Sequence, residues 1–137
     1  GQSYAKKLQL GFALIDKRRP KPNQAEVANL VGNLKDKHVI IIDDMIDTGG
    51  TICNAASSAI SNGAVDVTVV ATHPVLSGNS VKKLQESPIK KVIVCDTIKL
   101  KESQKFEKLE IVSTSDVFSE SIKRIDSGES LSSMFKI

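Results

Sequence analysis

Four apolar runs recur along the chain near positions 39, 67, 92 and 111, at intervals of 28, 25 and 19 residues. The run over 39–43 has no polar alternation, which is typical of a parallel strand covered on both faces. Residues 51–62 carry apolar side chains at helical spacing, and Gly63 follows where that helix should end. Because strands and helices alternate, the pattern predicts an α/β fold: a doubly wound, mainly parallel sheet flanked by helices, with ligand at the carboxyl ends of its strands.

Other segments give further elements. Ahead of the sheet we expect a short helix over 3–10, a strand over 12–16 and a Pro-containing loop. Residues 24–37 suit a helix and extended pieces equally. Later we expect a helix capped by Asn79, a surface loop or mobile segment over 98–108, and a docked tail after Gly128. A helix over 115–126 presents four apolar residues on one face: Val117, Phe118, Ile122 and Ile125.

Composition narrows the class of protein. The 137 residues fit a single domain, 1–137, and 40% apolar with 26% charged residues is typical of a soluble globular protein. A net charge of +3 and 4% aromatics argue against a nucleic-acid partner. No apolar run approaches the roughly 18 residues of a membrane span, and no signal peptide is evident. Two cysteines are too few for a disulfide framework, so we expect buried, reduced thiols in a cytoplasmic protein.

The first apolar run leads into the stretch that carries most of the chemistry. It ends in two carboxylates, Asp43 and Asp44, and a loop over 47–51 then precedes an alanine-rich helix. Glycines in this 47–51 loop let the backbone close around a phosphate, and N–H groups at a helix N-terminus bind anions. The carboxylates offer acceptors to hydroxyl groups. A phosphate beside a vicinal diol describes ribose 5-phosphate, and a plain helix-capping turn is the alternative.

Three further stretches accompany this one: Asp-Lys-Arg-Arg-Pro at 16–20, Ala-Thr-His-Pro-Val-Leu-Ser-Gly at 71–78, and Gly-Glu-Ser-Leu-Ser-Ser-Met-Phe at 128–135. The 39–51 stretch resembles the phosphoribosyl-diphosphate loop of the phosphoribosyltransferase fold. The other three resemble the catalytic flexible loop, an internal loop and the C-terminus of ribose-phosphate diphosphokinases. The chain is therefore similar to the C-terminal domain of that family. The family's N-terminal half, which would carry most ATP contacts and a metal-binding His and Asp, has no counterpart here.

The resemblance implies a reaction for the parent protein. The β,γ-diphosphate of ATP would pass to the 1-hydroxyl of ribose 5-phosphate, giving phosphoribosyl diphosphate and AMP for nucleotide biosynthesis, with Mg²⁺ as cofactor. This chain would supply the ribose 5-phosphate half of the site and be inactive alone. Family members form dimers that assemble into hexamers, so the parent is expected to be a homo-oligomer, with no nucleic-acid or membrane partner. A nucleobase phosphoribosyltransferase and a non-catalytic regulatory subunit of the diphosphokinase are the alternatives.

The resemblance also assigns residues. Lys17 and Arg19 would be the catalytic cations, and Arg19 would also bind ribose phosphate. Asp43 and Asp44 would receive the ribose hydroxyls, directly or through Mg²⁺. For Asp44, acceptance of backbone N–H groups at the strand end is the alternative. The 5-phosphate would be cradled by the 47–51 loop: Asp47, Thr48, Gly49, Gly50 and Thr51.

Three further positions stay open. Asp47 would orient the loop or face the reacting hydroxyl, because its charge repels a phosphate. Ser130 and Ser132 match tail serines that bind regulatory phosphate in some members of the family, and an ordinary tail is an equal reading. His73 follows a strand and has no carboxylate partner at useful spacing, so a structural role and a ligand role both remain.

Overall fold

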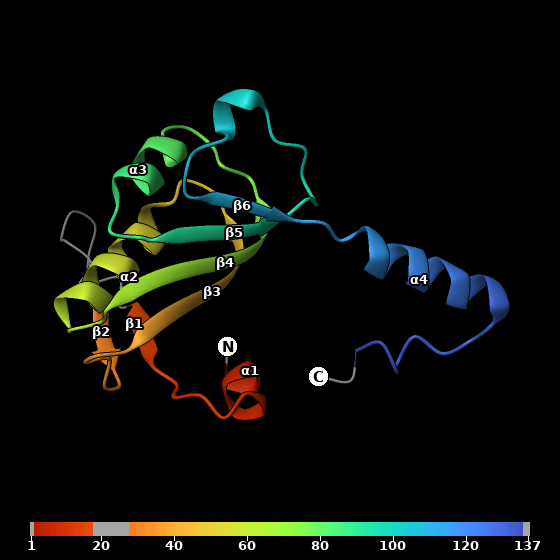
Figure 1. Ribbon diagram of the computed structural model, residues 1–137, viewed down its shortest axis with the longest axis horizontal. Coiled ribbons are helices and arrows are strands. Elements are labelled where there is room, and N and C mark those ends of the chain that lie inside the picture. The colour runs from red at the N-terminus through yellow and green to blue at the C-terminus, as the bar shows by residue number, and fades with distance from the viewer. Residues whose placement is uncertain (1, 18–27, 136–137) are drawn as a thin grey trace.

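The computed structural model describes residues 2–17 and 28–135 (Figure 1). In chain order the elements are α1 (Gln2–Lys7), β1 (Leu14–Lys17), β2 (Ala28–Val31), β3 (His38–Ile46), α2 (Gly50–Ser61), β4 (Asp66–Pro74), α3 (Ser80–Glu86), β5 (Lys91–Cys95), the 3-10 helix η1 (Glu102–Gln104), β6 (Leu109–Val112) and α4 (Ser115–Ser127). Strands β3 to β6 form a parallel sheet in sequence order, and β1 pairs with β2 in a separate antiparallel hairpin. The predicted α/β class with a parallel sheet is therefore confirmed.

The sheet brings the four apolar runs of the sequence side by side. Val67 of β4 pairs with Val39 of β3, and Val92 of β5 pairs with Leu109 of β6. Because the strands are parallel, their carboxyl ends meet at one edge of the sheet, as Figure 1 shows. The connections that leave this edge include the 47–51 loop between β3 and α2. Strand β2 shows that the extended alternative holds within 24–37.

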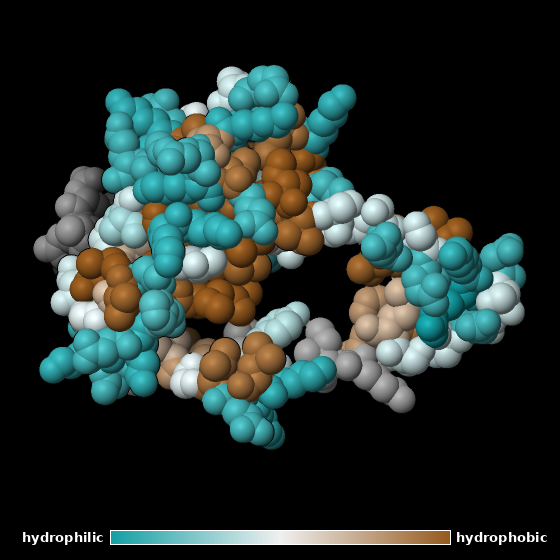
Figure 2. Space-filling view, in the orientation of Figure 1, coloured by the Kyte–Doolittle hydropathy of each residue, from teal (hydrophilic) through white to brown (hydrophobic). Residues whose placement is uncertain are grey.

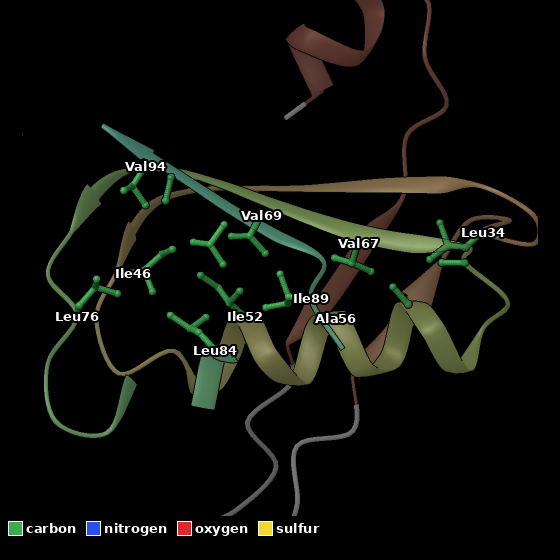
Figure 3. Close-up of a cluster of buried hydrophobic side chains, with 14 residues drawn as sticks. Leu34, Ile46, Ile52, Ala56, Val67, Val69, Leu76, Leu84, Ile89 and Val94 are labelled. Atoms are coloured by element: carbon green, nitrogen blue, oxygen red, sulfur yellow. The ribbon is translucent and has the colours of Figure 1, made fainter. Parts of the chain in front are cut away.

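The hydrophobic core lies between one face of the sheet and helices α2 and α3 (Figure 3). Its largest fully buried apolar side chains come from strands, helices and loops alike: Ile46, Val67, Val69, Leu84, Ile89, Val92 and Val94. Ala56 and Ala59 of α2 are almost completely buried, and their small side chains let the helix approach the strands closely. Leu100 and Phe106 pack against the same core. The segment predicted as a surface loop over 98–108 is therefore partly packed, and it contains η1.

The other face of the sheet is uncovered in the part of the chain that the structure describes. Side chains alternate between faces along a strand, and Ile40 and Ile42 of β3 are 56% and 46% exposed. Val112 of β6 lies on the same face and is 46% exposed. Figure 2 shows hydrophobic residues at the surface over the strands. The expectation that the 39–43 run is covered on both faces is therefore wrong for these residues, because α2 and α3 both cross over to one side.

Helix α4 leaves the sheet and projects from the body of the molecule (Figure 1). Its apolar side chains are exposed, by 52% at Val117, 62% at Phe118, 65% at Ile122 and 66% at Ile125. The predicted helix is present, and its apolar face is largely exposed. An apolar stripe indicates that a helix packs against something, but it does not specify the partner. None of the described helices has the length and hydropathy needed to cross a bilayer.

Two smaller expectations need adjustment. Cys53 and Cys95 are free thiols, but they are half-buried instead of buried. Burial raises the pKa of the Cys53 thiol, so its neutral form is favoured. Asn79 occupies the N-cap position of α3, as expected, but its side chain makes no capping hydrogen bond.

Asp96, just after β5, anchors the start of α4. Its Oδ2 atom accepts a hydrogen bond from the hydroxyl of Ser113 at 2.7 Å. Its Oδ1 atom accepts from the backbone N–H and the hydroxyl of Thr114, at 2.8 and 2.7 Å. These bonds, that of Ser113 foremost, favour the ionised carboxylate and lower the pKa of Asp96 from 3.8 to about 2. The anchor therefore depends on ionisation of this one carboxylate.

Acid is expected to release this anchor. Because the pKa of Asp96 is lower in the folded chain than in the unfolded chain, its contribution to stability is complete above about pH 4 and is lost as the pH falls through about 2. The protection factor of the Thr114 amide in hydrogen exchange should fall over this interval. In Asp96→Asn the same amide should show no such pH dependence. An equal decline in both proteins would contradict the assignment.

Candidate functional site

The 47–51 loop joins the carboxyl end of β3 to the start of α2. Gly49 occupies the N-cap position with φ of +74°, a left-handed conformation that glycine adopts without steric cost. Its carbonyl accepts the N–H of Cys53 at 3.0 Å, which is the first bond of the helix. The N–H groups at the beginning of α2 have no carbonyl ahead of them in the helix, and the helix dipole adds positive potential. The loop therefore presents donors suited to an anion.

A cavity of about 160 Å³ opens at this loop. Eight residues line it: Asp43, Met45, Asp47, Thr48, Gly49, Gly50, Thr51 and Ile52. The structure therefore brings Asp43 together with all five residues of the 47–51 loop. Asp44 is exposed and is absent from the lining.

The two adjacent carboxylates each accept one local backbone N–H. Asp43 Oδ1 accepts from the N–H of Asp44 at 3.0 Å, and Asp44 Oδ1 accepts from the N–H of Met45 at 2.8 Å. The contact of Asp44 is the alternative role considered for it above, acceptance of a backbone N–H at the end of the strand. The Oδ2 atom of Asp43 has no hydrogen-bond partner among the described residues. Half-buried beside the cavity, Asp43 therefore keeps an oxygen available to a hydroxyl group or a cation.

The basic residues predicted to be catalytic lie at the limit of what the structure describes. Lys17 is the last residue of β1 and stands opposite Ala28 of β2 in the hairpin. The side chain of Lys17 and all of Arg19 are outside the described residues.

His73 makes a structural contact in place of lining the cavity. Its Nδ1 atom lies 2.9 Å from the hydroxyl oxygen of Thr97, and that hydroxyl donates to the carbonyl of Thr72 at 3.0 Å. Because the single Thr97 hydroxyl hydrogen is used in this way, Nδ1 of His73 is the donor. The contact ties the end of β4 to the segment after β5. The structure thus gives His73 the partner that its sequence spacing did not suggest.

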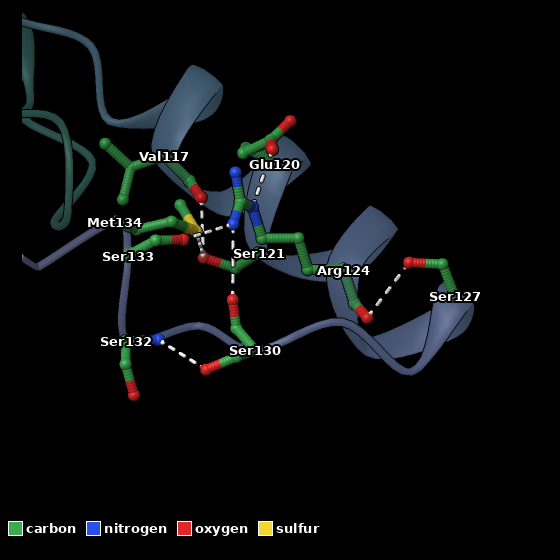
Figure 4. A network of polar contacts seen from close by, with 9 residues as sticks. All are labelled: Val117, Glu120, Ser121, Arg124, Ser127, Ser130, Ser132, Ser133 and Met134. Carbon is green, nitrogen blue, oxygen red and sulfur yellow. Dashed lines mark hydrogen bonds and ion pairs between the residues drawn. The ribbon is translucent and has the colours of Figure 1, made fainter.

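The predicted tail serines lie beside α4, whose Arg124 gathers the tail (Figure 4). Arg124 is held by Glu120 through Nε at 2.7 Å, and its Nη1 atom donates to the carbonyl of Ser130 at 3.2 Å and to the hydroxyl of Ser133 at 2.5 Å. The N–H of Ser132 donates to the hydroxyl of Ser130 at 3.2 Å. The tail therefore docks on α4, after the expected stop at Gly128, whose φ is +72°.

Sequence reasoning missed three side chains that contribute to the site. Met45 and Ile52 line the cavity, and Ser77 donates a hydrogen bond to the carboxylate of Asp47. One signal was present: the 71–78 stretch follows a strand that should neighbour β3. Loops that leave the same edge of a parallel sheet meet, which places this stretch against the 47–51 loop.

Comparisons with known proteins give consistent relatives. Residues 16–136 match the family described as the phosphoribosyl synthetase-associated domain. The chain is 51% identical over 125 residues to ribose-phosphate pyrophosphokinase of Coxiella burnetii, covering 90% of this chain and 39% of the relative. It is 48% identical over 132 residues to the enzyme of that name from Caldanaerobacter subterraneus subsp. tengcongensis, covering 96% and 42%.

A solved structure agrees with these relatives. Phosphoribosylpyrophosphate synthetase from Mycobacterium smegmatis matches with a TM-score of 0.84 and 34% sequence identity, over 93% of this chain and 41% of that chain. The chain thus spans about two fifths of the length of the proteins it matches.

Proposed function

Because the chain belongs to the phosphoribosyl synthetase-associated domain family, we propose that it forms the ribose 5-phosphate half of a ribose-phosphate diphosphokinase. The reaction transfers the β,γ-diphosphate of ATP to the 1-hydroxyl of ribose 5-phosphate and releases AMP, as a step of nucleotide biosynthesis. The observation that carries the proposal is the cavity in which Asp43 meets the whole 47–51 loop. An anion cradle beside a carboxylate suits a phosphate and a sugar hydroxyl of one molecule.

The loop residues divide the work of holding this substrate. N–H groups at the start of α2 would donate to the 5-phosphate, and the hydroxyls of Thr48 and Thr51 add further donors. Asp43 would accept a hydrogen bond from a ribose hydroxyl, while Asp44, outside the cavity lining, would act on the exposed side of the same sugar. Lys17 and Arg19 would approach from the hairpin to stabilise charge on the transferring diphosphate.

The donor atoms around the cavity could provide only some of the ligands that Mg²⁺ needs. Carboxylate oxygens are suited ligands, and the Oδ2 atom of Asp43 is available. Among the residues that the structure describes, no three His, Cys, Asp or Glu side chains gather closely enough to hold a metal ion. The protein would therefore contribute one or two carboxylates, Asp43 and Asp44, and substrate oxygens the remaining ligands. When bound, Mg²⁺ would neutralise charge on phosphate oxygens.

The exposed apolar surfaces support a larger parent subunit. The open face of the sheet and the apolar stripe of α4 are what a neighbouring domain would cover, since monomers rarely expose large contiguous apolar patches. The chain spans about two fifths of the length of its relatives. We therefore propose that it is the C-terminal half of a two-domain, homo-oligomeric, cytoplasmic subunit, with the ATP contacts in the other half. Regulatory phosphate at Ser130 and Ser132 belongs to the same proposal.

The test of this function uses the complete gene product. Incubation with ribose 5-phosphate, ATP and Mg²⁺ should yield AMP and phosphoribosyl diphosphate in equal amounts. ³¹P NMR of the reaction mixture measures both products. The 137-residue chain alone should release no AMP. Absence of AMP from the complete protein would contradict the proposal, and so would full turnover by the 137-residue chain.

The same cavity fits two other functions. A nucleobase phosphoribosyltransferase binds phosphoribosyl diphosphate in such a loop, and it would release diphosphate only when a nucleobase is added. A regulatory subunit would bind ribose 5-phosphate without releasing AMP. A second NMR sample with phosphoribosyl diphosphate and a nucleobase separates these outcomes, because a nucleobase phosphoribosyltransferase would release diphosphate there and a regulatory subunit would leave the phosphorus signals of both samples unchanged.

A further inference from the structure

The loop over residues 75–79, between β4 and α3, is hydrogen-bonded to the 47–51 loop through Ser77 and Asp47. Leu76 in this loop has φ of +48°, a left-handed conformation that is uncommon for a residue other than glycine. Its side chain is buried, its N–H donates to the carbonyl of Ile46 at 2.9 Å, and its own carbonyl accepts from Gln104 Nε2 at 3.1 Å. A residue kept in such a conformation by contacts on both sides marks a turn with a fixed geometry.

Ser77, the next residue in this turn, connects it to the 47–51 loop through two hydrogen bonds to Asp47. Its N–H donates to the carbonyl oxygen of Asp47 at 3.2 Å, and its hydroxyl donates to Asp47 Oδ1. Asp47 lines the cavity next to the start of α2, whereas Ser77 does not line it. Both the backbone and the carboxylate of Asp47 are thereby oriented by a residue outside the cavity lining.

A carboxylate at this position is unfavourable for anion binding unless it is directed elsewhere. An ionised Asp47 and a phosphate at the start of α2 repel each other, and the repulsion grows as their separation shortens and water is excluded. Aspartate side chains also bond readily to nearby backbone N–H groups, which are the donors that the anion needs. The Ser77 hydroxyl offers Asp47 a donor outside the 47–51 loop.

We propose that Ser77 is a positioning residue for sugar-phosphate binding. By donating to the Asp47 carboxylate, Ser77 prevents this carboxylate from accepting hydrogen bonds from the N–H groups of the 47–51 loop. Those N–H groups then remain available to the phosphate of the ligand. The inference rests on the proposed role of this loop as the 5-phosphate site.

The proposal predicts that Ser77 matters only while residue 47 carries a charge. In the complete gene product, Ser77→Ala should weaken ribose 5-phosphate binding by about five- to tenfold in isothermal titration calorimetry. In an Asp47→Asn background the same change should alter the Kd less than about twofold, because a neutral amide does not repel phosphate. Ser77→Thr, which keeps a hydroxyl donor, should bind close to wild type. It also keeps the comparison open should Ser77→Ala fold poorly.

A matched control comes from a second serine–aspartate pair. Ser113→Ala removes a hydroxyl that donates to Asp96 at 2.7 Å, away from the cavity lining, and should leave the Kd unchanged. An equal loss of affinity in the wild-type and Asp47→Asn backgrounds would indicate a structural brace and overturn the proposal, as would no loss in either. Failure of wild type to bind ribose 5-phosphate would overturn the proposed function as well. Wild-type binding with an unchanged Ser77→Ala variant would overturn this inference alone.

Discussion

Lys17→Ala in the complete gene product is expected to lower kcat for AMP release by about 10²–10³-fold, with a much smaller change in the KM for ribose 5-phosphate. Lys17 is the last residue of β1 and stands opposite Ala28 of β2. Diphosphate transfer spreads negative charge over phosphate oxygens in the transition state, and the protein contributes mainly positioning and cations. A cation that interacts more strongly with the transition state than with bound substrate affects kcat before it affects KM.

The neighbouring Arg18 provides the control for this prediction. The sequence prediction assigns the catalytic role to Lys17 and Arg19 and not to Arg18, since side chains alternate in direction along an extended segment. Steady-state assays at saturating ATP should therefore show a loss of less than about threefold for Arg18→Ala, and a loss for Arg19→Ala that includes a raised KM. Equal losses for Lys17→Ala and Arg18→Ala would indicate a general effect of positive charge and contradict the specific assignment.

Leu84→Ala is expected to lower the free energy of unfolding by about 2–5 kcal/mol, the range for deletion of a buried leucine side chain. Leu84 of α3 is completely buried in the core between sheet and helices. It also lies behind the 47–51 loop: a Cβ atom built on Gly49 would be 3.5 Å from Leu84 Cγ. A cavity at this position therefore removes support from the fold and from the loop together.

Two measurements distinguish these consequences. Urea unfolding should show the loss of stability for Leu84→Ala, while Val65→Ala, at a position that is 56% exposed, should change stability by less than about 0.5 kcal/mol. Hydrogen exchange of the amides over 48–51 should quicken in Leu84→Ala beyond the change in the remaining core. A uniform increase in exchange would contradict the local support of the loop by Leu84.

The strands of the sheet were predictable, because the runs near positions 39, 67, 92 and 111 are short, apolar and rich in β-branched residues. What covers each surface was not. Apolar spacing shows that Ile40 or Ile122 needs a partner, but it contains no information on whether that partner lies in the same 137 residues. Periodicity therefore could not predict that one face of the sheet is open or that α4 projects from the body of the molecule.

The candidate site also has a part that the sequence predicts and a part that it does not. Asp43 and the 47–51 loop are contiguous in sequence, and the fixed geometry of a strand–loop–helix turn makes their meeting predictable. Ser77 lies thirty residues from Asp47, and Gln104 lies further along the chain, so no local spacing connects them to the site. Their contacts depend on the order of β3 and β4 in the sheet and on the left-handed turn at Leu76.

The central claim is that Asp43 and the 47–51 loop hold one molecule of ribose 5-phosphate. A crystal structure of the complete gene product soaked with ribose 5-phosphate tests it most directly. The account predicts the 5-phosphate against the N–H groups at the start of α2, with a ribose hydroxyl within hydrogen-bond distance of the Asp43 carboxylate. Sugar phosphate bound away from this cavity, or a phosphate in the cavity with its ribose turned away from Asp43, would contradict the account.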